Sequence, residues 1–170
     1  FRGRIPFVGQ ADSGRWITAL DTLLAFDASV IVPGHGPVSR SARADLELTR
    51  EAANIWGTQG VHPHEANTYT DTVEALVRAQ AADDRIVAIG EIGLDYHYDH
   101  ADRTVQRTVF ERQLQLAADL DMPVVIHTRD ADADTRAILR AFSPLLRRKG
   151  VLHSFTSGLD LAEYCLAEGF

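Results

Sequence analysis

IVAIGEIGLDY, residues 86–96, is an apolar run that carries Glu91 and turns polar at its end, and it decides the fold of the second half of the chain. Three other apolar runs carry histidines: GVHPHEA (60–66), PVVIHTRD (123–130) and GVLHSF (150–155). A helix-like stretch lies in each interval between these runs. Alternating strands and helices predict a parallel sheet with covering helices, and metal-capable side chains at the strand ends are typical of an active site on a (β/α) barrel.

The same alternation sets the elements expected in residues 54–170. Strands are predicted at about 56–61, 86–90, 123–127 and 150–154, and helices at about 71–82, 103–120, 132–142 and 159–168. We therefore expect an α/β fold, a partial TIM-like (β/α) barrel with about four parallel strand–helix units, which are too few to close it.

Residues 1–53 have a different pattern of expected helices and strands. A helix is expected over 13–26, a short strand over 29–32 and a second helix within 41–53, which together form a small α/β segment. The turn PGHGP (33–37) places His35 between two glycines, which permit the unusual dihedral angles that ligand turns often need. We therefore expect two domains, 1–53 and 54–170.

The amino-acid composition limits the kinds of partner and cellular location that we expect for this protein. The formal net charge of −7 argues against broad electrostatic adhesion to nucleic acid, but an enzyme that holds phosphate through a metal and one or two arginines stays possible. The single cysteine, Cys165, excludes an internal disulfide and fits a reducing compartment. No apolar run approaches the length of a membrane span. We expect a cytoplasmic protein with no membrane partner.

Glu91, His127 and His153 are the main candidates for a metal site. Taken singly, Glu91 between two glycines favours a ligand over an ordinary surface carboxylate in a loop, whereas His127 reads as a satisfied core histidine. Three successive strand ends that offer His or Glu instead favour convergence on one point. Imidazole and carboxylate ligands suit zinc, manganese or iron-class ions better than calcium.

Four further residues are candidates for supporting roles. His62 and His64 flank Pro63 and read as ligands, proton donors or phosphate contacts, or as exposed imidazoles of a turn. Asp95, expected in the loop after Glu91, is placed to orient a ligand. Arg129 reads either as a bidentate phosphate clamp or as the partner of Asp130 or Asp132.

The motifs together resemble those of the TatD-type deoxyribonucleases, metal-dependent phosphodiesterases with an amidohydrolase-like barrel. The resemblance rests on five stretches: GVHPHEA, GEIGLDYHYD (90–99), the helix around 106–117, PVVIHTRDADADT (123–135) and GVLHSFTSG (150–158). It implies hydrolysis of DNA phosphodiesters by a metal-activated water.

The resemblance also implies roles for individual residues. Glu91, His127 and His153 correspond to metal ligands for Zn, Mn or Mg, and His62 and His64 to substrate contacts. From the residues themselves, we expect Glu91 and Asp95 to be the catalytic carboxylates and Arg129 to contact the substrate.

Two features of the family are not found in this sequence. The His-x-His pair of its first strand does not precede residue 54, and the chain stops before the strand whose Asp serves as ligand and general base. The resemblance thus covers the third to sixth strand units of eight, and we expect a severe loss of rate.

Residues 1–53 resemble something else, the C-terminal end of a metallo-β-lactamase-fold hydrolase. That resemblance makes His35 a former metal ligand. The alternative to a TatD-type hydrolase is therefore a catalytically inactive, incomplete fold or a fusion remnant of two metallohydrolases. An incomplete sheet has open edges through which copies of the chain can associate.

Overall fold

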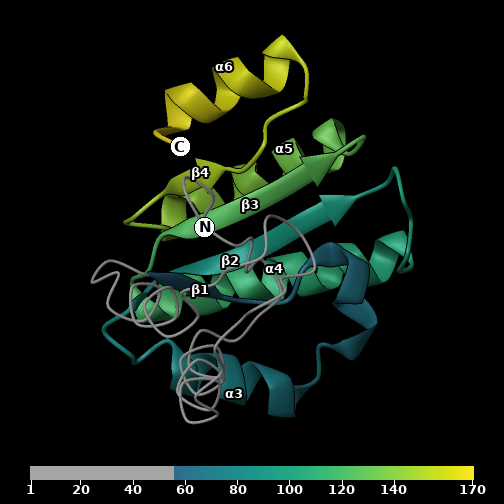
Figure 1. Cartoon of the computed structure of the whole chain (residues 1–170). Helices are drawn as coiled ribbons and strands as arrows, with labels where there is room; N and C mark the ends of the chain where they lie inside the picture. Colours follow the sequence, from purple (N-terminus) through teal and green to yellow (C-terminus); the bar gives the residue numbers. More distant parts are fainter. Residues whose placement is uncertain (1–55) are drawn as a thin grey trace, which may run out of the picture. The chain divides into compact units, whose positions relative to one another are not determined.

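The computed structural model describes residues 56–170 and divides the chain into two units, Phe1–Trp56 and Gly57–Phe170 (Figure 1). The elements expected in residues 1–53, and His35 with them, lie outside the described residues. The described helices and strands all belong to the second unit.

A four-stranded sheet forms the centre of this unit. Its strands are β1 (Gly57–Gln59), β2 (Ile86–Asp95), β3 (Val124–Arg129) and β4 (Gly150–Leu152). They pair in the order β1-β2-β3-β4, and every pair is parallel. The expected α/β fold of four parallel units is confirmed.

Helices connect the strands in the expected places. They are α3 (Asp71–Gln80), α4 (Arg103–Leu120), α5 (Asp132–Phe142) and α6 (Leu159–Glu168), with short 3-10 segments η1 (Pro63–Thr68) and η2 (Ser143–Leu145). The sheet lies against α4 and α5 (Figure 1). None of the helices in the described part of the chain has the length and apolarity needed to cross a membrane.

Strand β2 is longer than the sequence predicts, and this corrects two expectations. It continues past residue 90 to Asp95, so Glu91 lies inside the strand and Asp95 is its last residue rather than part of a loop. Gly90 and Gly93 lie within this strand, on either side of Glu91 and Ile92. In the structure they let β2 approach β3 closely, since a Cβ on Gly90 would lie 2.7 Å from the Cβ of Val125.

The register of β2 shifts beside Glu91. Gly90 pairs with Val125 and Ile92 with Ile126, so Glu91 is the extra residue of a bulge. A bulge re-aims one side chain without ending the strand. Glu91 therefore lies among the apolar residues of β2 and still turns its carboxylate to the polar side of the sheet.

The two faces of the sheet have different characters. On β3 burial alternates, so that Val124 and Ile126 are buried while His127 and Arg129 on the other face are partly exposed. The buried face packs in one cluster with Phe110 and other apolar residues of the helices. Each such large side chain contributes about 1.5–3 kcal/mol when fully buried. The core thus fixes the strands and leaves one face for polar residues.

Two buried glutamines of α4 hold the segments that leave the strands. Gln113 accepts from the Val61 amide at 2.7 Å and donates to the Val61 carbonyl at 2.9 Å. Gln106 accepts from the Asp95 amide at 2.8 Å and donates to the carbonyls of Asp95 and Ala101. The backbone before η1 and the end of β2 are therefore fixed to the same helix.

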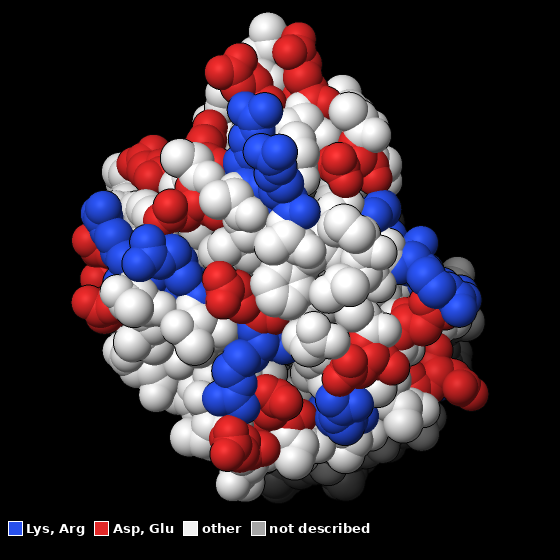
Figure 2. Space-filling view, turned by 180° about the vertical axis from the view of Figure 1, so that it is seen from behind, with Lys and Arg blue, Asp and Glu red and all other residues white. Residues whose placement is uncertain are grey.

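Charges on the side seen from behind Figure 1 are intermixed, with basic and acidic side chains next to one another (Figure 2). The face shown in Figure 2 therefore offers no continuous basic surface for a nucleic acid backbone. Ion pairs also join neighbouring helices: Arg112 of α4 pairs with Asp71 and with Glu74 of α3, each at 2.7 Å.

Gly93 provides a test of the close approach of β2 to β3. Its φ is +139°, and a Cβ there would collide with the carbonyl oxygen of His127. We expect Gly93→Ala to lower the free energy of unfolding by at least about 2 kcal/mol, from backbone strain plus steric overlap. The measurement is urea unfolding followed by circular dichroism.

Gly158→Ala is the matched control. Gly158 has a φ of −77°, and its added Cβ would meet Asp132 Oδ2 at an ordinary 3.6 Å. We expect this control to change stability by less than about 1 kcal/mol. Equal losses in the two variants would contradict the packing argument for Gly93.

Candidate metal centre

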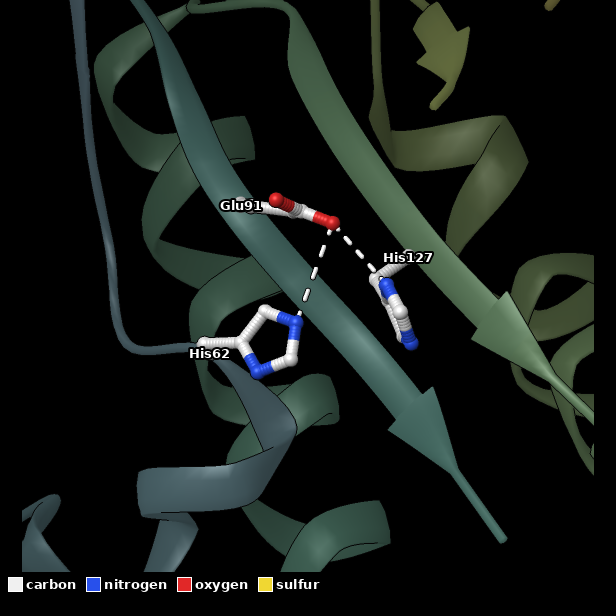
Figure 3. A group of neighbouring side chains, drawn as sticks. All are labelled: His62, Glu91 and His127. Atoms are coloured by element: carbon white, nitrogen blue, oxygen red, sulfur yellow. Dashed lines mark hydrogen bonds and ion pairs between the residues drawn. The ribbon is translucent and has the colours of Figure 1, made fainter. Parts of the chain in front are cut away.

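Three side chains from separate elements meet on the polar face of the sheet: His62, Glu91 and His127. Each offers a ligand atom, and these atoms all lie within 4.8 Å of one another (Figure 3). His62 precedes η1, Glu91 is the bulge residue of β2 and His127 belongs to β3. Two imidazoles and one carboxylate fit a divalent ion of the zinc or manganese class.

The loop before η1 orients His62. Its Nδ1 accepts a hydrogen bond from the His64 amide at 3.2 Å, and its Nε2 lies 3.8 Å from Glu91 Oε1. Burial, together with the nearby His127, lowers the pKa of His62 to about 4. The ring is therefore neutral near pH 7, the form in which imidazole binds metals.

Glu91 keeps its charge in this surrounding. Burial alone would raise its pKa, but the hydrogen bond from His127 and the nearby His62 outweigh burial and lower the pKa below its usual value. Glu91 Oε1 lies 2.9 Å from His127 Nδ1, and the side chain is only 11% exposed. A shielded carboxylate that stays ionised is a suitable ligand for a cation.

Asp95 is the most enclosed carboxylate of the site, with a side chain that is 0% exposed. Its Oδ2 accepts from His64 Nε2 at 2.8 Å and from His127 Nε2 at 2.9 Å. Its Oδ1 accepts from the amides of His97 at 3.0 Å and Tyr98 at 2.9 Å. Both oxygens are therefore engaged by protein donors, and Asp95 fixes two imidazoles at once.

These hydrogen bonds determine how Asp95 and His127 titrate. Burial alone would raise the pKa of Asp95, but bonds from the Tyr98 amide, His64 and His127 outweigh it and lower the pKa to about 2. Burial alone would lower the pKa of His127, but Glu91 and Asp95 outweigh it and raise that pKa. In a metal site, one nitrogen of such a histidine binds the ion while a carboxylate holds the other.

His153 lies apart from the three-residue group. It follows β4, its amide donates to the Ile126 carbonyl at 2.7 Å, and its Nε2 lies 3.1 Å from Ser154 Oγ. Within residues 56–170, His62 rather than His153 completes the group of close ligand atoms. The sequence places all four residues near strand ends, but it does not predict this pairing.

Arg129 does not pair with either acid that the sequence offers. Asp130 pairs with His97 Nδ1 at 2.9 Å, and Asp132 accepts from the Gly158 amide at 2.8 Å. The Arg129 guanidinium instead lies 5.0 Å from the centre of the Tyr98 ring. Between residues 56 and 170 the Arg129 guanidinium forms no ion pair.

The stretch HYDH (97–100) is part of the site but was not among the sequence candidates. The ring of His64 contacts those of Tyr98 and His100 edge-on, at 5.5 and 4.6 Å between centroids. The run of histidine and tyrosine residues directly after GLD is the sequence feature that indicates this part of the site.

The chain is similar to several known proteins. A family model described as TatD related DNase matches residues 21–170. The 3'-5' ssDNA/RNA exonuclease TatD of Cronobacter turicensis is 43% identical over 122 residues, which cover 72% of this chain and 46% of that protein. The metal-dependent hydrolase YabD of Bacillus subtilis, itself uncharacterized, is 34% identical over 125 residues, which cover 74% of this chain and 49% of that protein.

A solved structure shows the same likeness. The crystal structure of YJJV, a TatD homolog from Escherichia coli K12, has a TM-score of 0.65 and 26% identity, covering 96% of this chain and 62% of that one. The chain spans about half the length of the two curated relatives. The lactamase-fold resemblance of residues 1–53 gains no support from these comparisons.

The lowered pKa of Asp95 predicts a pH dependence of stability. In metal-free protein, an Asp with a pKa of about 2 when folded and 3.8 when unfolded stabilises the fold above pH 4. That contribution, about 2 kcal/mol, is lost as the pH falls toward 2. We expect Asp95→Asn to be less stable than wild type near pH 6, and the difference to shrink in acid.

Urea unfolding in EDTA at several pH values measures this difference. Asp130→Asn, which removes an exposed carboxylate paired with His97, is the control and should keep the acid slope of the wild type. A constant gap between Asp95→Asn and wild type from pH 6 to pH 2 would contradict the assignment.

Proposed function

The chain belongs to the TatD-related DNase family, and from this premise we propose that it binds a divalent metal and hydrolyses phosphodiester bonds of nucleic acid. The observation that carries the proposal is the group His62, Glu91 and His127, whose ligand atoms lie within 4.8 Å of one another. The names of the relatives, an exonuclease and a metal-dependent hydrolase, support the same chemistry.

The proposed division of roles follows the contacts at the site. A bound divalent ion supplies a Lewis acid and a water of lowered pKa. Glu91 supplies the negative charge that holds the cation, and Asp95 keeps His127 in a fixed orientation. Arg129 and His64 bind a phosphate oxygen of the substrate. The Arg129 guanidinium is placed for this role because it has no ion pair in the described part of the chain.

We assign His153 as a further ligand on three grounds. The family resemblance gives the histidine of GVLHSF this role, and the residue follows β4, the strand beside His127 on β3. Its charge also adds to the lowering of the Glu91 pKa, so the carboxylate is within its electrostatic reach. Zinc, manganese and magnesium remain the candidate ions.

The alternative function is a non-catalytic, incomplete fold, and one observation favours it. Strands β1 and β4 each pair on one side only within the described sheet, and such edges promote association of copies. The assignment of residues 1–53 to a lactamase-fold remnant with His35 as a former ligand, and a cytoplasmic location, are further proposals that rest on the sequence alone.

Glu91→Gln tests the metal site. It keeps the shape of the side chain but removes its charge, so we expect it to purify without stoichiometric metal. We also expect cleavage of 3′-labelled single-stranded DNA in Mn²⁺ to fall more than about 100-fold, since even indirect partners of metal ligands typically cost 10–100-fold. Metal analysis and the cleavage rate are the two measurements.

Glu65→Gln is the matched control, because Glu65 is an exposed carboxylate of η1, the segment that His62 caps. It should retain both metal and activity. Equal metal content and equal rates in Glu91→Gln and wild type would remove Glu91 from the site. A wild-type protein that binds metal, forms dimers by light scattering and cleaves nothing would favour the alternative function.

His153→Ala tests whether the metal is held by His62, Glu91 and His127 alone or by these three residues together with His153. If His153 is a ligand, its loss should weaken metal binding by at least about tenfold, and His62→Ala should do the same. Isothermal titration of metal-free protein with Zn²⁺ or Mn²⁺ gives both affinities. An unchanged affinity in His153→Ala would leave the three residues that the fold brings together as the whole set.

A further inference from the structure

Three residues beside the metal centre form what we call the stacking platform: Tyr98, His100 and Arg129. The Tyr98 ring is 53% exposed, and its plane is within 6° of that of His100, with centroids 5.8 Å apart. The Arg129 guanidinium lies over the Tyr98 ring at 5.0 Å. Single exposed aromatic residues are common on proteins, so the platform needs a further reason to be called a site.

That reason is the way Tyr98 is held. Its amide donates to Asp95 Oδ1 at 2.9 Å, and its ring makes a T-shaped contact with the ring of His64, with centroids 5.5 Å apart. His64 in turn donates to Asp95 Oδ2, the oxygen that also holds His127. An exposed ring fixed on several sides loses little freedom when a ligand stacks on it, which favours binding.

The position of Arg129 joins the platform to the metal centre. Arg129 and His127 lie on the same face of β3, two residues apart, which is about 6.6 Å along a strand. Arg129 forms no ion pair within residues 56–170, although the whole chain has a net charge of −7. A guanidinium beside an exposed ring matches a ligand that carries both an anionic group and an aromatic face.

We propose that Tyr98, supported by Arg129 and His100, stacks on a nucleobase of a single-stranded nucleic acid whose phosphate lies at the metal centre. This inference rests on the proposed function and names how the substrate is selected. Bases of a single strand have free faces, whereas those of a duplex are already stacked on one another. The platform therefore selects single strands and does so with little dependence on sequence.

The test is binding of fluorescently labelled oligodeoxythymidylate in EDTA, where no cleavage occurs, measured by fluorescence anisotropy. We expect Tyr98→Ala to weaken binding by about 5- to 150-fold, the range of one lost base–aromatic stack. Tyr98→Phe keeps the ring and should bind within about twofold of wild type. Leu166→Ala, which removes an exposed apolar side chain of α6, is the control and should bind as wild type does.

A fully abasic oligodeoxynucleotide of the same length separates base stacking from backbone contact. Wild type and Tyr98→Ala should bind it equally, because it offers no base to stack. Equal affinity of the two proteins for oligodeoxythymidylate would overturn the proposal, as would an equal loss on both oligonucleotides or a failure of wild type to bind oligodeoxythymidylate.

Cleavage in Mn²⁺ distinguishes failure of this inference from failure of the proposed function. If the platform selects the substrate, Tyr98→Ala should raise KM for oligodeoxythymidylate more than it raises KM for the abasic strand, and Tyr98→Phe should keep both KM values near those of wild type. A wild type that cleaves neither strand refutes the proposed function, while the binding comparison in EDTA still decides whether Tyr98 stacks on a base.

Discussion

The Asp95 carboxylate, shielded from solvent, is the contact on which the arrangement of the site depends. It accepts from two imidazoles, His64 and His127, and from two backbone amides of the turn that follows β2. A buried charge is tolerated only when its hydrogen-bonding capacity is filled, and here four donors fill it. The residue that looks like part of a loop in the sequence thus connects three segments of the chain.

The helix α4 supports this arrangement from the other side of the sheet. Gln106 fixes the backbone of Asp95, and Gln113 fixes that of Val61, next to His62. Both side-chain amides are buried, and each accepts from a backbone amide through its oxygen and donates to a backbone carbonyl through its nitrogen, so neither can turn without losing at least two bonds. The two segments that carry the site residues therefore share one rigid support.

Sequence patterns predict the fold well because strand and helix periods are local properties. The helices α4, α5 and α6 begin and end at the predicted residues, and the parallel order follows from the alternation. Strand β2 is longer than predicted, because its pairing with β3 continues past Gly90 and Gly93, which pack closely against that strand. A local pattern does not show whether a glycine ends a strand or lies where two strands approach closely.

The candidate site was predicted in its residue types and only partly in its geometry. Glu91 and His127 meet as their spacing suggests, whereas the choice of His62 over His153 as the third close ligand depends on the path of the loop before η1. The place of Tyr98 depends on its backbone bond to a carboxylate three residues earlier. Such contacts form only in the folded chain and do not appear as a periodic pattern in the amino-acid sequence.

The bulge at Glu91 also constrains how the gene for this protein can vary in length. Because side chains alternate between faces, inserting or deleting one codon between the start of β2 and Glu91 would turn Glu91 toward the helices and an isoleucine toward the polar side. The turn at 82–85, just ahead of the strand, consists of exposed residues and tolerates changes in length far better. Natural and engineered insertions should therefore accumulate in that turn and avoid the strand after it.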